Sequence, residues 1–178
     1  LGSGFDSLGI ALSMYNQVWM EEFDGIAITS KDAVAVPTDQ SNLIYWSASY
    51  LYKECGRRFP GLKLVQENNI PMTRGLGSSS ACIVAGLLGA NRFLGNPLTQ
   101  HDLVNLACKI EGHPDNTTPA FTGGLVTSAI EGGRVHSVTV PIAAHIRFGL
   151  FIPPFELKTE TARSALPKSY SREDAVYN

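Results

Sequence analysis

The segment that most constrains this chain is a loop rich in glycine and serine that leads into a helix. Gly75 and Gly77 allow positive φ and a close approach of the backbone to a ligand. The run Ser78–Ser80 suits the cap and first turn of a helix, where N–H groups lack partners. Apolar residues recur at helical spacing from Ala81 to Leu88, which predicts a buried helix. We expect the start of this helix to face whatever the loop binds.

The loop has two interpretations from its residues alone, a plain capping turn and a phosphate cradle. Free amides and the positive end of the helix dipole make a helix start an anion site, and phosphate is the anion we expect. Three consecutive serine hydroxyls favour the cradle, because they cost helix stability and can bind phosphate oxygens or Mg²⁺. The loop lacks the Gly-Lys-Ser/Thr ending of a Walker A loop and is not a G-x-G-x-x-G dinucleotide turn.

Length and composition indicate one compact domain. A chain of 178 residues buries roughly 70% of its unfolded surface. With 44% hydrophobic and 17% charged residues and a net charge of −2, it resembles a soluble α/β protein without a footprint for nucleic acid or membrane. Since no signal peptide or membrane-length apolar run is visible, we expect a cytoplasmic protein. Cys55, Cys82 and Cys108 are odd in number and widely spaced, so we expect buried thiols.

Periodicity predicts a mixture of strands and helices along the chain. Runs compatible with strands lie at residues 11–23, 26–28, 34–36, 62–65, 123–129, 134–140 and 148–152. Helical patterns lie at residues 39–55, 78–93, 99–110 and 159–166, and from residue 171 onward. The short intervals between the first three strands predict an antiparallel meander.

Two further segments gather polar groups that are capable of chemistry. Residues 1–9 place glycines and serines around the carboxylate of Asp6, which either caps the next turn or binds a ligand. Residues 111–116 follow a predicted helix, and a solvated turn is the alternative to a functional cluster there. Zinc binding is not expected in this second segment, because His113 has no cysteine or second histidine at ligand spacing.

Four segments together resemble motifs of the homoserine kinases, which belong to the GHMP kinase family. Residues 1–9 are similar to the first motif, whose usual asparagine would precede Leu1. The string P-x-x-x-G-L-G-S-S-x-A at residues 71–81 is similar to the second motif. Glu-Gly-His-Pro-Asp-Asn at residues 111–116 and Glu-Leu-x-Thr-x-x-Ala-Arg-x-x-Leu-Pro at residues 156–167 are similar to later ones. The resemblance therefore spans nearly the whole chain.

The resemblance implies a kinase that uses ATP and Mg²⁺. It implies transfer of the γ-phosphate to the side-chain hydroxyl of L-homoserine, which gives O-phospho-L-homoserine for threonine biosynthesis. Ser79 and Glu111 are the implied Mg²⁺ ligands. Asn42 is an implied adenine contact, although an asparagine at a helix start is also an ordinary cap. The implied ATP-binding residues are Pro71, Met72, Thr73, Arg74, Gly75, Leu76, Gly77, Ser78, Ser79, Ser80, Ala81 and Asn42.

The same resemblance implies residues for the acceptor. Asp6 would bind the amino group of the substrate, and Arg163 would bind its α-carboxylate with a planar guanidinium fork. No lysine stands out as the activating partner that several relatives use, so positioning and transition-state stabilisation are expected to carry the reaction. The implied acceptor-site residues are Asp6, His113, Asp115, Asn116 and Arg163, and the implied catalytic residues are Asn116, Thr159 and Arg163.

The implied fold is α+β, a GHMP kinase N-terminal domain with a mixed sheet packed against helices, related to a domain of one ribosomal protein. We expect residues 1–155 to form this ATP-binding domain and residues 156–178 to begin an incomplete C-terminal domain, with both chain ends truncated. Homodimerisation is left open.

Two alternatives to the homoserine kinase interpretation are kept. Another GHMP kinase, of mevalonate or shikimate type, would lack the amino-acid contacts of Asp6 and Arg163. A non-catalytic binding or regulatory domain would not need Ser78, Ser79 and Glu111.

Overall fold

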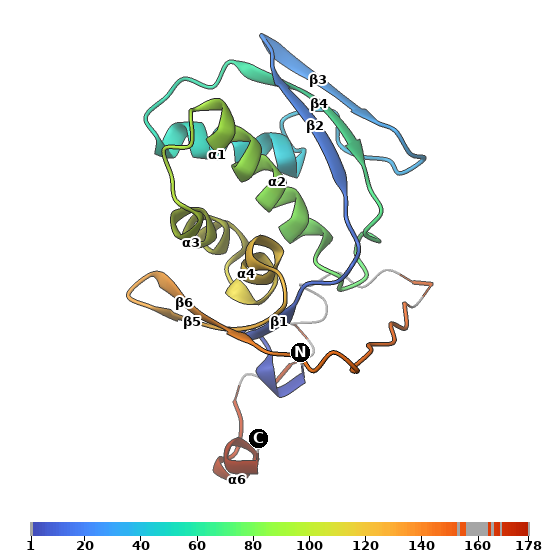
Figure 1. The fold of residues 1–178 in the computed structure, drawn as a ribbon, viewed down its shortest axis with the longest axis vertical. Helices are drawn as coiled ribbons and strands as arrows, with labels where there is room; N and C mark the ends of the chain where they lie inside the picture. The colour runs from blue at the N-terminus through green and yellow to red at the C-terminus, as the bar shows by residue number, and fades with distance from the viewer. Residues whose placement is uncertain (1, 153, 156–163, 165, 168, 178) are drawn as a thin grey trace.

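Helices lie between two three-stranded sheets in the computed structural model, which describes residues 2–152, 154–155, 164, 166–167 and 169–177 (Figure 1). In chain order the elements are η1 (Gly2–Gly4), β1 (Leu8–Ile10), β2 (Gln17–Glu22), β3 (Gly25–Ser30), α1 (Leu43–Glu54), β4 (Gly61–Glu67), α2 (Ser78–Phe93), α3 (Gln100–Glu111), α4 (Pro114–Thr122), β5 (Leu125–Glu131), β6 (Arg134–Val140) and α6 (Arg172–Tyr177). The predicted α+β class is confirmed.

The first sheet is mixed and has the order β2-β4-β3. β3 pairs in parallel with β4, and α1 forms the crossover that a parallel pair requires. β2 pairs antiparallel with the other edge of β4, with Met20 opposite Leu64. The predicted meander is therefore wrong, because β4 comes from later in the chain and separates β2 from β3.

The strand predicted at residues 34–36 does not form. The carboxylate of Asp32 accepts hydrogen bonds from Ser30 Oγ at 2.9 Å, from Val34 N at 2.8 Å and from Asn68 N. These bonds turn the chain directly after β3, as aspartate commonly does. The bond from Asn68 is the main reason that the pKa of Asp32 lies below its usual value.

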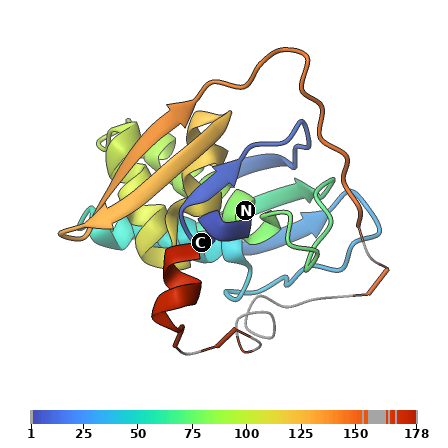
Figure 2. The same ribbon diagram turned by 90° about the horizontal axis from the view of Figure 1, so that it is seen from below.

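The second sheet is antiparallel and has the order β1-β5-β6. α3 and α4 cover it on the side of the helical layer (Figure 1). After Val140 the chain leaves the sheet and runs along the outside of the body (Figure 2). No strand is found at residues 148–152, which corrects that prediction. These residues are exposed and pair with no described strand, and a lone extended segment gains no ladder hydrogen bonds.

The helix starts follow local capping signals. Thr99 and Asp102 form a capping box at α3, where the sequence predicts a helix. Ser171 accepts a hydrogen bond from Asp174 N at 3.0 Å at the start of α6, where a helix is also predicted. α4 was not predicted, although Pro114 at its first position is a typical helix-start signal. None of the described helices combines the length and apolar character needed to cross a membrane.

The main core lies where α1 and α2 pack on the mixed sheet. Its fully buried side chains come from all three elements, and they include Ile44, Leu51, Leu62, Leu64, Ile83 and Leu87. α1 packs closely on α2 at Gly86, where an added Cβ would lie 2.8 Å from Ser47 Cβ and would also contact Ile44 O. A glycine is required there because the obstacle includes backbone atoms.

Gly86→Ala is expected to lower the free energy of unfolding by about 1–3 kcal/mol, the usual cost of overpacking a core. Gly89→Ala on the same helix is the matched control, since an added Cβ there meets only the flexible side chain of Met20. We expect this control to stay within about 1 kcal/mol of the parent, because alanine favours a helix over glycine. Urea unfolding of both variants measures the difference, and equal midpoints would contradict the close contact.

Candidate functional site

The glycine loop ends at the amino-terminal end of α2, as predicted. Gly75 and Gly77 have φ values of 71° and 75°, which are left-handed and suit glycine. Gly77 is the N-cap, and no side chain caps the first-turn amides of α2. Uncapped amides at a helix start are able to bind an anion such as a phosphate group.

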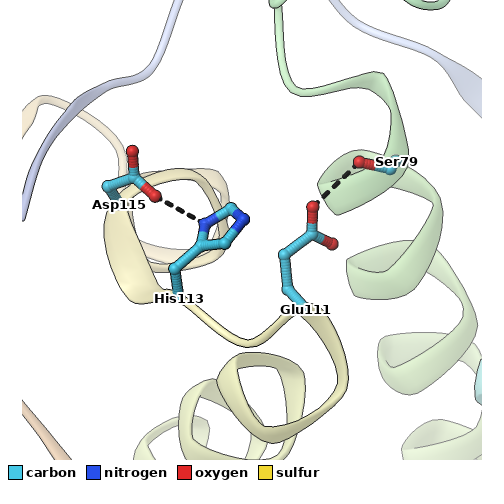
Figure 3. A network of polar contacts seen from close by, with 4 residues as sticks. All are labelled: Ser79, Glu111, His113 and Asp115. Carbon is cyan, nitrogen blue, oxygen red and sulfur yellow. Dashed lines mark hydrogen bonds and ion pairs between the residues drawn. The ribbon is translucent and has the colours of Figure 1, made fainter. Parts of the chain in front are cut away.

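Ser79 and Glu111 meet at this helix start although 32 residues separate them in the sequence. Ser79 lies in the first turn of α2, and its Oγ donates a hydrogen bond of 2.9 Å to Glu111 Oε1 at the end of α3 (Figure 3). Hydroxyl and carboxylate oxygens are ligands that suit Mg²⁺, which keeps water and nucleotide phosphates as its remaining ligands. The residues present therefore fit the cation that the sequence implies.

The junction between α3 and α4 carries the second group of polar residues. Gly112, with φ of 91°, ends α3, and His113 is the N-cap of α4. His113 Nδ1 and Asp115 Oδ1 are 2.7 Å apart, and each side chain is 13% exposed. Figure 3 shows the His113 ring between Asp115 and Glu111, so the junction presents its polar groups on one side.

Asp6 joins this group from the start of the chain. Asp6, His113 and Asp115 each offer one ligand atom, and these atoms lie within 4.8 Å of one another. β1 packs directly on α4, and an added Cβ at Gly9 would overlap the backbone carbonyl of Asp115. Only glycine permits this approach, which brings the Asp6 loop to the start of α4.

Asn116 lies beside the loop. An added Cβ at Gly77 would be 3.8 Å from Asn116 Oδ1. A cavity of ≈ 550 Å³ opens next to this pair, between α2, α4 and the connection from β1 to β2. Its lining is mostly apolar and includes Leu12, Tyr15, Leu76, Val84 and Leu88. Asn116 therefore stands where the loop, α4 and an apolar hollow meet.

Asn42 has a structural role as the N-cap of α1. Its side chain is buried, and its Oδ1 accepts a hydrogen bond of 3.0 Å from Ile44 N. Its Nδ2 donates to Pro37 O and to Gln66 Oε1, both at 3.0 Å. Because both amide atoms bind protein groups, this geometry favours the cap interpretation over the adenine contact.

The remaining predicted residues, Thr159 and Arg163, lie outside the described part of the chain. Their roles at the acceptor stay predictions. The division at residue 155 into two domains also stays a prediction.

All three cysteines are free thiols, and Cys108 is buried while Cys55 and Cys82 are partly buried. Burial, with a smaller contribution from the charge of Glu111, raises the pKa of Cys82 to about 11. Burial and the charge of Asp115 also raise the pKa of Cys108. Both thiols are therefore protonated at neutral pH.

Alkylation of Cys82 by iodoacetamide is expected to be slow at pH 8, since a pKa of about 11 leaves on the order of one thousandth of the thiol ionised. Its rate should rise with pH toward 11, and peptide mapping by mass spectrometry measures it. The same cysteine in urea is the control and should react as an ordinary thiol. Equal rates in the folded and unfolded protein would contradict the burial of this thiol.

Comparisons with known proteins agree with this geometry. Residues 42–124 match the family described as the GHMP kinases N terminal domain. The chain therefore has the fold of a GHMP kinase N-terminal domain. The matched segment includes α1, β4, the glycine loop, α2, α3 and α4, and so it contains both the loop and the Ser79–Glu111 pair.

Several curated relatives of the chain are named homoserine kinase. The homoserine kinases of Caldicellulosiruptor bescii and Desulfitobacterium hafniense are each 43% identical over 180 residues, which is 100% of this chain and 59% and 61% of those proteins. A crystal structure of homoserine kinase from Cytophaga hutchinsonii superposes with a TM-score of 0.74 at 28% identity, covering 96% of this chain and 57% of that one. The chain thus spans about three fifths of the length of these relatives.

Proposed function

We propose that the protein is a homoserine kinase, which transfers the γ-phosphate of ATP to the side-chain hydroxyl of L-homoserine. The observation that carries this proposal is that Asp6 and Asp115 gather around His113, directly after the end of α3 where Glu111 contacts Ser79. A phosphate site beside a pocket rich in carboxylates suits an acceptor that carries an ammonium group. Relatives named homoserine kinase, 40–43% identical, support the same choice.

On the donor side, the first-turn amides of α2 would bind the phosphates of ATP. Ser79 and Glu111 would hold Mg²⁺, which would neutralise charge on the phosphates when it is bound. Fixed donors at the helix start stabilise charge that develops on the transferred group, and they need no reorganisation during the reaction. The chain therefore contributes mainly electrostatic stabilisation on this side.

On the acceptor side, a carboxylate of Asp6 would hold the ammonium group by a charge-assisted hydrogen bond. His113 and Asp115 would line the same pocket, and Asn116 beside Gly77 would orient the hydroxyl toward the phosphate. Arg163 would bind the α-carboxylate, and Thr159 would approach the hydroxyl. Holding both ends of a small substrate supplies the orientation on which phosphoryl transfer depends.

The wider role that we propose follows from this reaction. The product would enter threonine biosynthesis in the cytoplasm, with ATP and L-homoserine as the small-molecule partners and Mg²⁺ as the cofactor. Whether the enzyme works as a homodimer stays open.

Asp6→Asn is expected to raise the KM for L-homoserine strongly, since loss of a charged hydrogen bond costs about 1.5–3 kcal/mol, which is on the order of 10- to 150-fold. The KM for ATP should change little, because Asp6 belongs to the acceptor cluster. Ser79→Ala is the contrasting variant and should weaken use of ATP and Mg²⁺ instead. ADP release at varied ATP and varied L-homoserine separates the two effects.

Two outcomes would contradict the proposal. Turnover with mevalonate, shikimate or galactose in place of L-homoserine would keep a GHMP kinase and reject the amino-acid contacts. Binding of ATP without turnover of any acceptor would favour a binding domain. Arg163→Ala tests the carboxylate contact in the same assay and should lower turnover of L-homoserine.

A further inference from the structure

Three side chains of the acceptor cluster have a second capability. Asp6, His113 and Asp115 present one imidazole and two carboxylates whose ligand atoms lie within 4.8 Å of one another. We propose that these residues bind a divalent transition metal ion such as Zn²⁺, at a site distinct from the Ser79–Glu111 pair. Ligand spacing near His113 does not indicate this site, because Asp6 lies 107 positions away in the sequence and only the fold brings the two together.

The geometry is close to that of a three-ligand metal site. Zn²⁺ binds imidazole nitrogen and carboxylate oxygen at about 2.0–2.2 Å, so tetrahedral ligand atoms lie roughly 3.4 Å apart. His113 Nδ1 and Asp115 Oδ1 are 2.7 Å apart, which is closer than this spacing. The largest separation among the three ligand atoms is at most 4.8 Å, which is wider than this spacing. Displacements of about 1–2 Å in side chains would form the site and leave a fourth position for water.

The backbone holds the three ligands in place. His113 and Asp115 belong to the N-cap and first turn of α4, and the contact at Gly9 keeps the Asp6 loop against that helix. The dipole of α4 places the equivalent of roughly half a positive charge at the start of the helix, and this charge repels a bound cation. The negative charges of the two carboxylates outweigh this repulsion from the helix dipole. All three side chains are only partly exposed, so solvent screens their attraction for the cation less.

The two cation sites differ in the ions that they favour. Imidazole suits zinc, cobalt, nickel and copper, whereas oxygen ligands suit magnesium. Ser79 and Glu111 offer oxygen only, while the cluster includes the nitrogen of His113. A transition metal ion should therefore enter the cluster even when Mg²⁺ is in excess.

This site has a regulatory consequence that rests on the proposed function. Asp6 is the carboxylate assigned to the substrate ammonium group, so the metal ion and L-homoserine would compete for it. Transition metal ions would then inhibit the kinase by raising the KM for the amino acid and not the KM for ATP.

Cobalt is the probe for the test, because Co²⁺ bound by nitrogen and oxygen ligands absorbs visible light. Titration of the whole chain with Co²⁺ in excess Mg²⁺ should give a saturable absorption band at one equivalent. His113→Gln and Asp6→Asn should each weaken Co²⁺ binding by roughly 10- to 100-fold or more, since even indirect partners of a metal have effects of that size. Circular dichroism checks that each variant is folded.

The control is a double variant, His101→Gln with His136→Gln, which removes two exposed histidines that do not belong to the cluster and should keep the band. Loss of the band in this control, or a band that both cluster variants retain, would overturn the proposal. So would the absence of any saturable binding.

Addition of L-homoserine separates this inference from the proposed function. Displacement of Co²⁺ supports the shared site. A specific band that L-homoserine does not displace keeps the metal site and overturns the competition. Homoserine-dependent ADP release without any Co²⁺ band keeps the kinase and overturns the metal site.

Discussion

The close packing of α1 on α2 is the contact on which the site depends. Because Gly86 lets the backbone of α1 approach, α2 is held firmly between the mixed sheet and the other helices. Its amino-terminal end is then fixed directly after the glycine loop. The first-turn amides stay without a side-chain cap, since Gly77 offers none. A rigid helix with an open start is a preorganised anion site, and this core packing makes it one.

The junction between α3 and α4 determines where the remaining polar groups lie. A left-handed Gly112 ends one helix, and Pro114 starts the next two residues later. This short connection sends Glu111 toward Ser79 and leaves His113 to contact Asp115 (Figure 3). Glu111, His113 and Asp115, which we propose bind the cation and the acceptor, thus come from one turn of the chain. Their proximity follows from the length of that turn, and Gly9 adds Asp6 by letting β1 approach α4.

Local signals in the sequence predicted the parts of the fold that depend on neighbouring residues. The starts of α2, α3 and α6 are of this kind. Pairing between distant segments was not predictable, because β4 enters between β2 and β3 only after α1 has crossed over. The extended residues 148–152 failed as a strand for the same reason, since pattern alone supplies no partner. Asn42 shows a further limit, because its residue type fits both a cap and a ligand contact.

The identity of the phosphorylated product decides whether the chain acts as a homoserine kinase. Phosphorus and proton NMR of the reaction with ATP, Mg²⁺ and L-homoserine would follow the transferred group. We expect a phosphate monoester on the side-chain oxygen of L-homoserine, formed together with ADP. Release of inorganic phosphate alone, or an ester that forms only with an acceptor lacking an ammonium group, would contradict it.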